Sequence, residues 1–142
     1  MPKISVLMGA YNCAETIGKS IESIQAQTIT DWELIICNDG SNDNTVDVVK
    51  QYQENDDRIV LIENEKNSGL SFTLNRCLEL AKGDICARMD SDDLCDPQRF
   101  EIQLEFLEQH PEYSFVSTTM KRFDEDGFYD EPAIGEGYSP TN

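Results

Sequence analysis

Short apolar runs alternate along the chain with segments in which apolar residues recur every three or four positions. The runs are rich in β-branched residues and are bounded by Asn, Asp, Gly and Ser, as buried strands often are. They predict five strands, at Ile4–Met8, Trp32–Cys37, Ile59–Ile62, Ile85–Met89 and Tyr113–Thr118.

The periodic segments between these runs predict amphipathic helices, and the stripe of Ile17, Ile21 and Ile24 is the first of them. Later helices are expected at Thr45–Asn55, from Leu70 to Ala81 and after Asp96-Pro97, a helix-capping pair. Strands that alternate with helices of about a dozen residues predict βαβ units. We therefore expect a Rossmann-like α/β fold, a mostly parallel sheet flanked by helices on both faces.

The pattern weakens after Thr119. Asp126-Gly127 predicts a tight turn between short strands at Met120–Phe123 and Phe128–Tyr129. The tail, Pro132–Asn142, shows no periodicity. We expect one α/β domain over residues 1–119 and the start of a second region over residues 120–142.

The charge balance narrows the range of partners. The chain has 28 acidic and 11 basic residues, a formal net charge of -17. Such a surface repels nucleic acid and anionic lipid, so neither is an expected direct partner. An anionic small molecule would need a local positive charge, and a bound metal ion would supply it.

The cysteine content and the hydropathy indicate a cytoplasmic protein. The five cysteines form no C-x-x-C pair, and the single histidine, His110, does not complete a Cys/His zinc site, so we expect reduced thiols. The first residues lack the long apolar region of a signal peptide, and no run approaches the length of a membrane span. A place at the inner face of a membrane would depend on parts outside these residues.

The segment Arg88-Met89-Asp90-Ser91-Asp92-Asp93 brings three carboxylates into four residues, directly after an apolar run. If that run is a strand, the carboxylates lie at its carboxyl end, where open α/β sheets bind ligands. Crowded carboxylates repel one another, and a hard divalent cation that also holds a phosphate would relieve the repulsion. A solvated acidic turn that caps the next helix would explain the same residues.

Small or polar residues also end the first two predicted strands, at Ala10-Tyr11-Asn12 and Asn38-Asp39. Because the carboxyl ends of parallel strands lie on one edge, we expect these segments to converge with Asp90–Asp93 on one cleft. Tyr11 would offer an aromatic face for stacking, or would be a core aromatic. Asp39 would accept a hydrogen bond from a ring N–H or a sugar hydroxyl, or would be a turn residue beside Gly40.

Two arginines lie close to the acidic segment. Arg88 interrupts an apolar strand, so we expect it to be buried and paired with Asp90 or Asp92; direct contact with a phosphate is the alternative. Arg99, on the following helix, is placed to brace Asp93 in the same way.

A series of short motifs follows along most of the chain, and their order matches that of a known family. It begins with Ile4–Met8, Ala10-Tyr11-Asn12, Ser23-Ile24, Gln27-Thr28, Trp32–Ile36 and Asn38-Asp39-Gly40-Ser41. It continues with Lys66-Asn67-Ser68-Gly69, Asn75, Ala81-Lys82-Gly83, Asp90–Asp93, Pro97 and Arg99. Over residues 3 to 118 this pattern resembles the inverting family 2 glycosyltransferases, and jointly it is highly specific.

The resemblance implies a GT-A fold, a nucleotide-diphosphate sugar as donor, with a UDP-sugar foremost, and Mn²⁺ or Mg²⁺ as cofactor. It implies transfer to a saccharide or lipid-linked saccharide acceptor in cell-surface polysaccharide synthesis. On the matching positions, Tyr11 and Asp39 would hold the base, and Asp92 and Asp90 would ligate the metal. The nucleotide-binding residues would be Ala10, Tyr11, Asn12, Asp39, Asn67, Arg88, Asp90 and Ser91.

In the family that the chain resembles, a carboxylate from the second half of the protein acts as general base, and that half recognises the acceptor. We therefore expect the general base beyond Asn142, and a 142-residue chain that binds donor but is inactive by itself; self-association stays open. The alternative is a non-catalytic nucleotide-sugar or protein-binding module, which metal-dependent binding of UDP would argue against.

Three other folds with acidic or glycine-rich loops fit less well. A phosphotransferase of the haloacid dehalogenase type would have Thr or Val where Leu94 follows Asp90 by four positions. An EF-hand loop needs Gly at its sixth position, which Cys95 occupies. A Rossmann dehydrogenase would show G-x-G-x-x-G after the first strand, and this sequence does not.

Overall fold

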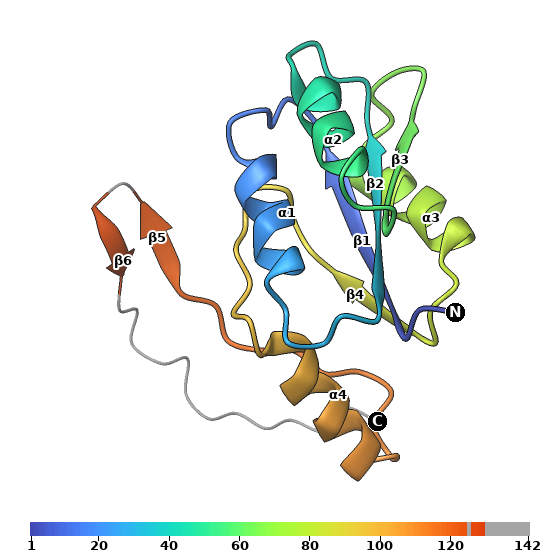
Figure 1. Cartoon of the computed structure of the whole chain (residues 1–142), viewed down its shortest axis with the longest axis vertical. Helices are drawn as coiled ribbons and strands as arrows, with labels where there is room; N and C mark the ends of the chain where they lie inside the picture. Colours follow the sequence, from blue (N-terminus) through green and yellow to red (C-terminus); the bar gives the residue numbers. More distant parts are fainter. Residues whose placement is uncertain (125, 130–142) are drawn as a thin grey trace. The chain divides into compact units, whose positions relative to one another are not determined.

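A four-stranded parallel sheet organises the first 105 residues of the computed structural model, which describes residues 1–124 and 126–129 (Figure 1). A second unit begins at Phe106. The strands of the sheet follow the order β3-β2-β1-β4. Their bounds are β1 (Ile4–Ala10), β2 (Trp32–Asn38), β3 (Ile59–Glu63) and β4 (Ile85–Arg88).

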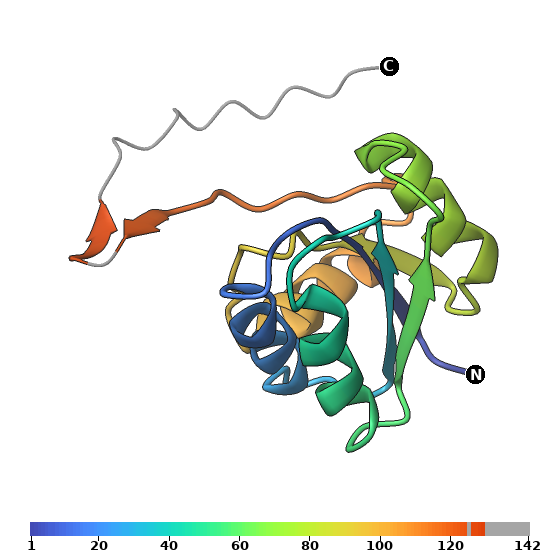
Figure 2. The ribbon, with the colours of Figure 1, turned by 90° about the horizontal axis from the view of Figure 1, so that it is seen from above.

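Helices cover both faces of this sheet. Figure 2 shows α1 (Ile17–Gln25) and α2 (Thr45–Gln53) on one face and α3 (Leu70–Leu80) on the other. Helix α4 (Arg99–Gln109) begins in the same unit, where Phe100 and Leu104 are buried. The expected α/β architecture, a mostly parallel sheet between two layers of helices, is confirmed.

The strand register brings the loops of the sheet to one edge. Strand β1 is central, and it pairs in parallel with β2, Ala10 lying opposite Asn38. On its other side β1 pairs with β4, Leu7 lying opposite Arg88. The segments after Ala10, Asn38 and Arg88 therefore leave the sheet on the same side, as the sequence predicts.

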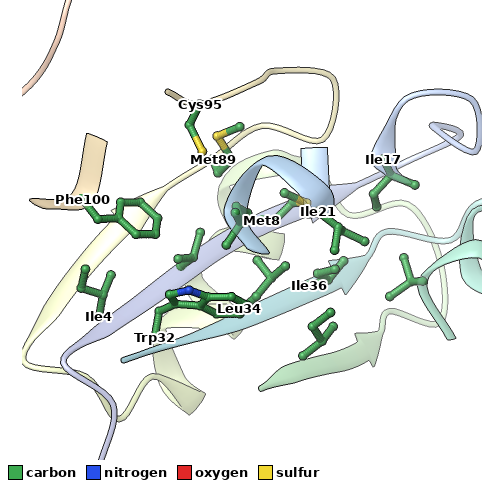
Figure 3. Close-up of a cluster of buried hydrophobic side chains, with 14 of the residues drawn as sticks. Ile4, Met8, Ile17, Ile21, Trp32, Leu34, Ile36, Met89, Cys95 and Phe100 are labelled. Atoms are coloured by element: carbon green, nitrogen blue, oxygen red, sulfur yellow. The ribbon is translucent and has the colours of Figure 1, made fainter. Parts of the chain in front are cut away.

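The core is built from the alternating faces of β1 and β2. Ile4, Val6 and Met8 share one face of the sheet and belong to one buried cluster with the buried residues of α1. In the close-up of Figure 3, Met8 lies by Ile21 of α1, and Ile4 lies on the side of Phe100. The opposite face carries Leu7 and Ile35, which pack with the partly buried Leu74 of α3. Burial of both faces explains why these strands are continuous apolar runs rather than alternating ones.

A buried carboxylate closes the amino-terminal end of the sheet. Glu33 accepts hydrogen bonds from Ser5 Oγ (2.6 Å) and from the backbone N–H of Lys82 (2.7 Å). Ser5 Oγ in turn accepts the N–H of Gly83 (2.8 Å). A Cβ at Gly83 would lie 2.6 Å from the backbone nitrogen of Ser5, so only glycine fits this approach. These bonds fix the point at which β4 begins.

The second unit corrects one prediction and confirms another. The strand expected at Tyr113–Thr118 is wrong, because these residues form no strand. Pro111 follows α4, Tyr113 stacks on Phe106 with ring centroids 5.9 Å apart, and Phe115 is 77% exposed. Strand composition alone is therefore not sufficient here, because a strand also needs a partner to form ladder hydrogen bonds.

The hairpin expected after Thr119 is present. Strands β5 (Arg122–Asp124) and β6 (Gly127–Tyr129) pair antiparallel, and Gly127 has a φ of 124°, in the region that favours glycine. The rest of the expected second region, residues 130–142, lies outside the described residues. Among the described helices, none has the length and apolar character needed to cross a membrane.

Ile21→Ala tests the core, because Ile21 is fully buried on the face of α1 that meets the sheet. We expect the free energy of unfolding to fall by about 2–5 kcal/mol, the usual effect of a buried isoleucine cavity. Ile102→Ala is the matched control, since Ile102 is 57% exposed on α4 and its loss should change stability by less than about 1 kcal/mol. Denaturant unfolding measures both, and equal effects would contradict the described core.

Candidate functional site

A cleft of 760 Å³ opens at the carboxyl end of β1, between the loops that leave the sheet there. It is lined by residues 9–16, Asp39, Asp43, Asn67, Gly69, Leu70, Thr73 and residues 90–92. Every site residue expected from the sequence lines this cleft except Arg88. The expected convergence of three strand ends is therefore confirmed as a single concave surface.

Side chains of the loops after β1 and β2 join these loops to each other. Asn12 has a left-handed backbone with a φ of 48°, its N–H donates to Ser41 Oγ (2.9 Å), and its Oδ1 accepts the N–H of Asn42 (2.8 Å). Asp43 accepts the N–H of Ala14 (3.1 Å). These contacts hold Tyr11 and its neighbours on the cleft wall.

Asp43 is a lining residue that the sequence analysis missed. The Thr45 side chain, which hydrogen-bonds to its carboxylate at the start of α2, lowers the pKa of Asp43. The signal was the run Ser41-Asn42-Asp43-Asn44-Thr45, in which an acid two residues ahead of a helix is placed to accept backbone N–H groups.

Tyr11 is 47% exposed on the cleft, so it is not a core aromatic. This removes the structural alternative that the sequence left open, and it leaves the ring available to a ligand. Leu70, at the start of α3, is 50% exposed on the same surface. The cleft thus presents apolar area beside its acidic groups, as small-molecule sites usually do.

Asp39 is buried at the back of the cleft, where only 4% of it is exposed. Its Oδ1 accepts the N–H of Ser68 (2.8 Å) and the side-chain amide of Asn64 (2.6 Å), and its Oδ2 accepts the N–H of Gly69 (2.8 Å). Burial by itself would raise the pKa of Asp39, but the hydrogen bonds from Asn64, Ser68 and Gly69 outweigh it and hold the pKa below its usual value. Asp39 is therefore ionised at neutral pH and shapes the loop that carries Asn67.

A second layer of residues supports Asp39. Asn64 also bonds to Thr73 Oγ1 (3.2 Å), and its Oδ1 accepts from Arg76 Nη1 (2.6 Å). The sequence analysis missed Asn64 and Arg76. Asn64 directly follows β3, so the strand-end rule that selected Asp39 on β2 would have found it.

Arg88 pairs with Asp90 through two hydrogen bonds, Nε to Oδ1 (3.0 Å) and Nη2 to Oδ2 (3.1 Å). The expected pairing with an acid of the segment is confirmed, but the expected burial is wrong, because the Arg88 side chain is 58% exposed. Strand β4 is an edge of the described sheet, and its short length leaves Arg88 at an open face. Arg88 therefore orients Asp90 from outside the cleft.

The remaining acids of the segment differ in their surroundings. Burial, followed by the charges of Asp92 and Asp90, raises the pKa of Asp93, and Arg99 partly opposes this. Arg99 acts on Asp93 through its charge, while its guanidinium donates to the backbone oxygen of Arg88 (3.1 Å). The Asp92 carboxylate is exposed on the cleft and has no hydrogen-bond partner among the described residues.

Asp90 and Asp92 are the kind of carboxylate ligands that a protein provides to Mg²⁺ or Mn²⁺. Both present carboxylate oxygens at the cleft, two positions apart on one loop. The described residues contain no group of three or more His, Cys, Asp or Glu side chains arranged as a complete cage. A hard cation that takes its other ligands from a substrate diphosphate and from water needs only one or two carboxylates.

Residues 5–139 match the family model described as glycosyl transferase family 2. The putative glycosyltransferase EpsE of Bacillus subtilis is 51% identical over 127 residues, which are 89% of this chain and 46% of EpsE. Chondroitin synthase of Escherichia coli is 34% identical over 139 residues, which are 98% of this chain and 20% of that protein. The chain therefore spans less than half the length of these curated relatives.

Solved structures share the fold. S. aureus TarS (residues 1–349), determined in complex with UDP-GlcNAc, superimposes with a TM-score of 0.72 at 27% identity, over 77% of this chain and 32% of that 1–349 chain. The shared part contains the GT-A sheet that the sequence led us to expect.

Asp39→Asn tests the role of the buried carboxylate in the loop. The amide cannot accept all of the hydrogen bonds from Asn64, Ser68 and Gly69, so we expect the free energy of unfolding at pH 7 to fall by about 1–3 kcal/mol. Because the pKa of Asp39 is lower in the folded state, its contribution is complete above the unfolded pKa and is lost as the pH falls through the folded one.

The difference in the free energy of unfolding between wild type and Asp39→Asn should accordingly shrink as the pH is lowered from 6 toward 3. Urea unfolding of both proteins at each pH measures it. A difference that stays constant over this range would show that the charge of Asp39 does not hold the loop.

Proposed function

This chain belongs to glycosyl transferase family 2, and we propose that its cleft binds a nucleotide-diphosphate sugar, a UDP-sugar foremost, together with a divalent cation. We propose further that the sugar passes to a saccharide or lipid-linked saccharide acceptor, with inversion, in polysaccharide synthesis. The observation that carries the proposal is the charge of the cleft. Its described lining includes Glu15, Asp39, Asp43, Asp90 and Asp92 but no lysine or arginine.

The acidic lining makes a cation necessary for an anionic donor. A diphosphate placed among ionised carboxylates is repelled, and the low-dielectric walls of a cleft strengthen that repulsion. In the proposal, Asp92 contributes carboxylate oxygens to the cation, and Asp90 supports it while paired with Arg88. When bound, the cation neutralises the charge that develops on the leaving diphosphate.

The nucleoside would occupy the other side of the cleft. Tyr11 offers an exposed ring for stacking, with Ala10 and Asn12 on either side of it. Asp39 Oδ2 accepts one hydrogen bond, from Gly69, and a carboxylate oxygen can accept a second one, from a ring N–H. Asn67 lies on the loop that Asp39 holds, so the base and this loop would be positioned by the same carboxylate.

TarS supports the choice of nucleotide, since it was solved with UDP-GlcNAc. Chondroitin synthase supports the choice of a polysaccharide product. The general base is proposed to lie beyond Asn142 and the acceptor site outside this cleft, in the part of the relatives' length that this chain does not span. Within the cleft Asp39 is hydrogen-bonded to its loop and Asp43 to Thr45, so neither is placed to accept a proton from an acceptor.

Metal-dependent binding is the first test. Calorimetry of the chain with UDP and Mn²⁺ should show binding that EDTA abolishes. Asp92→Asn should keep the fold and weaken binding in the presence of Mn²⁺ by about 1–3 kcal/mol, the scale of one charge-assisted contact. Asp47→Asn is the control, because Asp47 is an exposed acid of α2 outside the cleft. Affinity that EDTA leaves unchanged would contradict the proposal and favour a metal-independent binding module.

Turnover is the second test. We expect the 142-residue chain to release UDP from UDP-sugars slowly, and no faster when oligosaccharide acceptors are added. A missing general base lowers the rate by about 10²–10⁴-fold, and a missing acceptor site lowers it further. Acceptor-stimulated turnover on the order of 10 s⁻¹, typical of a whole enzyme, would place both functions within this chain. The carboxylates of residues 124–131 would then be the first candidates for the base.

A further inference from the structure

The loop that carries Asp90 and Asp92 has no regular secondary structure from residue 89 to residue 98. Its backbone N–H and C=O groups therefore need partners outside a helix or sheet. Several of these partners are polar side chains of α1 and of the turn that follows it. They lie beside the apolar stripe that α1 buries in the core.

Ser20 and Ser23 hold the first part of the loop. Ser20 is fully buried, and its Oγ donates to the backbone oxygen of Asp93 (2.7 Å). Ser23 Oγ accepts the backbone N–H of Cys95 (3.2 Å). Both contacts fall within three residues of Asp92.

Gln27 holds the end of the loop and the start of α4. Its side chain is 3% exposed, and its Nε2 donates to the backbone oxygen of Asp96 (2.7 Å). Its Oε1 accepts the backbone N–H of Phe100 (3.0 Å), in the first turn of α4. One amide thus joins the loop on one side to the helix on the other.

Asp92 itself has no partner among the described residues, so its position is set by the backbone on either side of it. We propose that Ser20 and Gln27 are positioning residues for the cation site, which hold the loop so that the Asp92 and Asp90 carboxylates face the cleft. This inference rests on the proposed function, because it presupposes that these carboxylates take a divalent cation. It gives a role to Gln27, which the sequence pattern singled out and the donor site does not use.

The test compares two buried serines. Ser20→Ala removes the bond to Asp93, and Ser5→Ala removes bonds of the same kind at the opposite end of β1, where Ser5 binds Glu33 and Gly83. Both variants should lower the melting temperature. Only Ser20→Ala should weaken Mn²⁺ binding to the UDP-loaded chain, by about three- to tenfold, the equivalent of one buried hydrogen bond.

Mn²⁺ binding is measured by calorimetry and by the electron paramagnetic resonance signal of free Mn²⁺, well below the melting temperature of each variant. Gln27→Met is the second variant, because it keeps the length of the side chain and removes the hydrogen bonds to Asp96 and to Phe100. It should weaken Mn²⁺ binding at least as much as Ser20→Ala. Mn²⁺ affinity equal to that of wild type in both variants would overturn the inference alone. A wild-type chain that does not bind UDP with Mn²⁺ would overturn the proposed function and the inference with it.

Discussion

The backbone N–H groups of Ser68 and Gly69 converge on the buried carboxylate of Asp39, each at 2.8 Å. Asp39 follows β2 directly, whereas the two amides belong to the loop before α3, so this carboxylate joins two segments that the sheet alone leaves separate. Gly40 lies so close to that loop that a Cβ there would be 2.9 Å from the backbone nitrogen of Asn67. The wall of the cleft on this side therefore depends on Asp39, which holds the loop before α3, and on Gly40, which lets that loop approach.

The use of carboxylates to hold loops also gives the cleft its negative charge. Carboxylates accept several backbone N–H groups at once, which suits the irregular loops at the carboxyl ends of parallel strands. Backbone N–H groups donate to Asp39 and Asp43, and Asp90 forms an ion pair with Arg88. The result is a concave surface whose described lining has acidic side chains but no lysine or arginine. The proposed joint binding of an anionic donor and a cation rests on this acidic lining, which follows from how the loops are built.

The sequence predicted the parts of the structure that depend on local patterns. Periodicity identified the four strands of the sheet, and the rule that parallel strands end on one edge predicted that Tyr11, Asp39 and Asp92 share one cleft. Prediction from the sequence failed where the structure of a segment depends on residues that are distant in the chain. The apolar run 113–118 has the composition of a strand but forms no strand, and Arg88 is exposed because β4 is an edge.

Helix α1 shows how far a simple periodic pattern can be followed. Ile17, Ile21 and Ile24 recur at helical spacing and were recognised as a core stripe. Ser20 and Ser23 each precede one of these isoleucines by a single position, which places them along the border of that stripe, and Gln27 lies in the turn that follows α1. Such polar residues are easily taken for the solvent-facing side of an amphipathic helix. Ser20 and Gln27 are buried nonetheless, because an irregular loop covers them and needs their hydrogen bonds. The sheet thus supports the acidic loop through α1 as well as through β4.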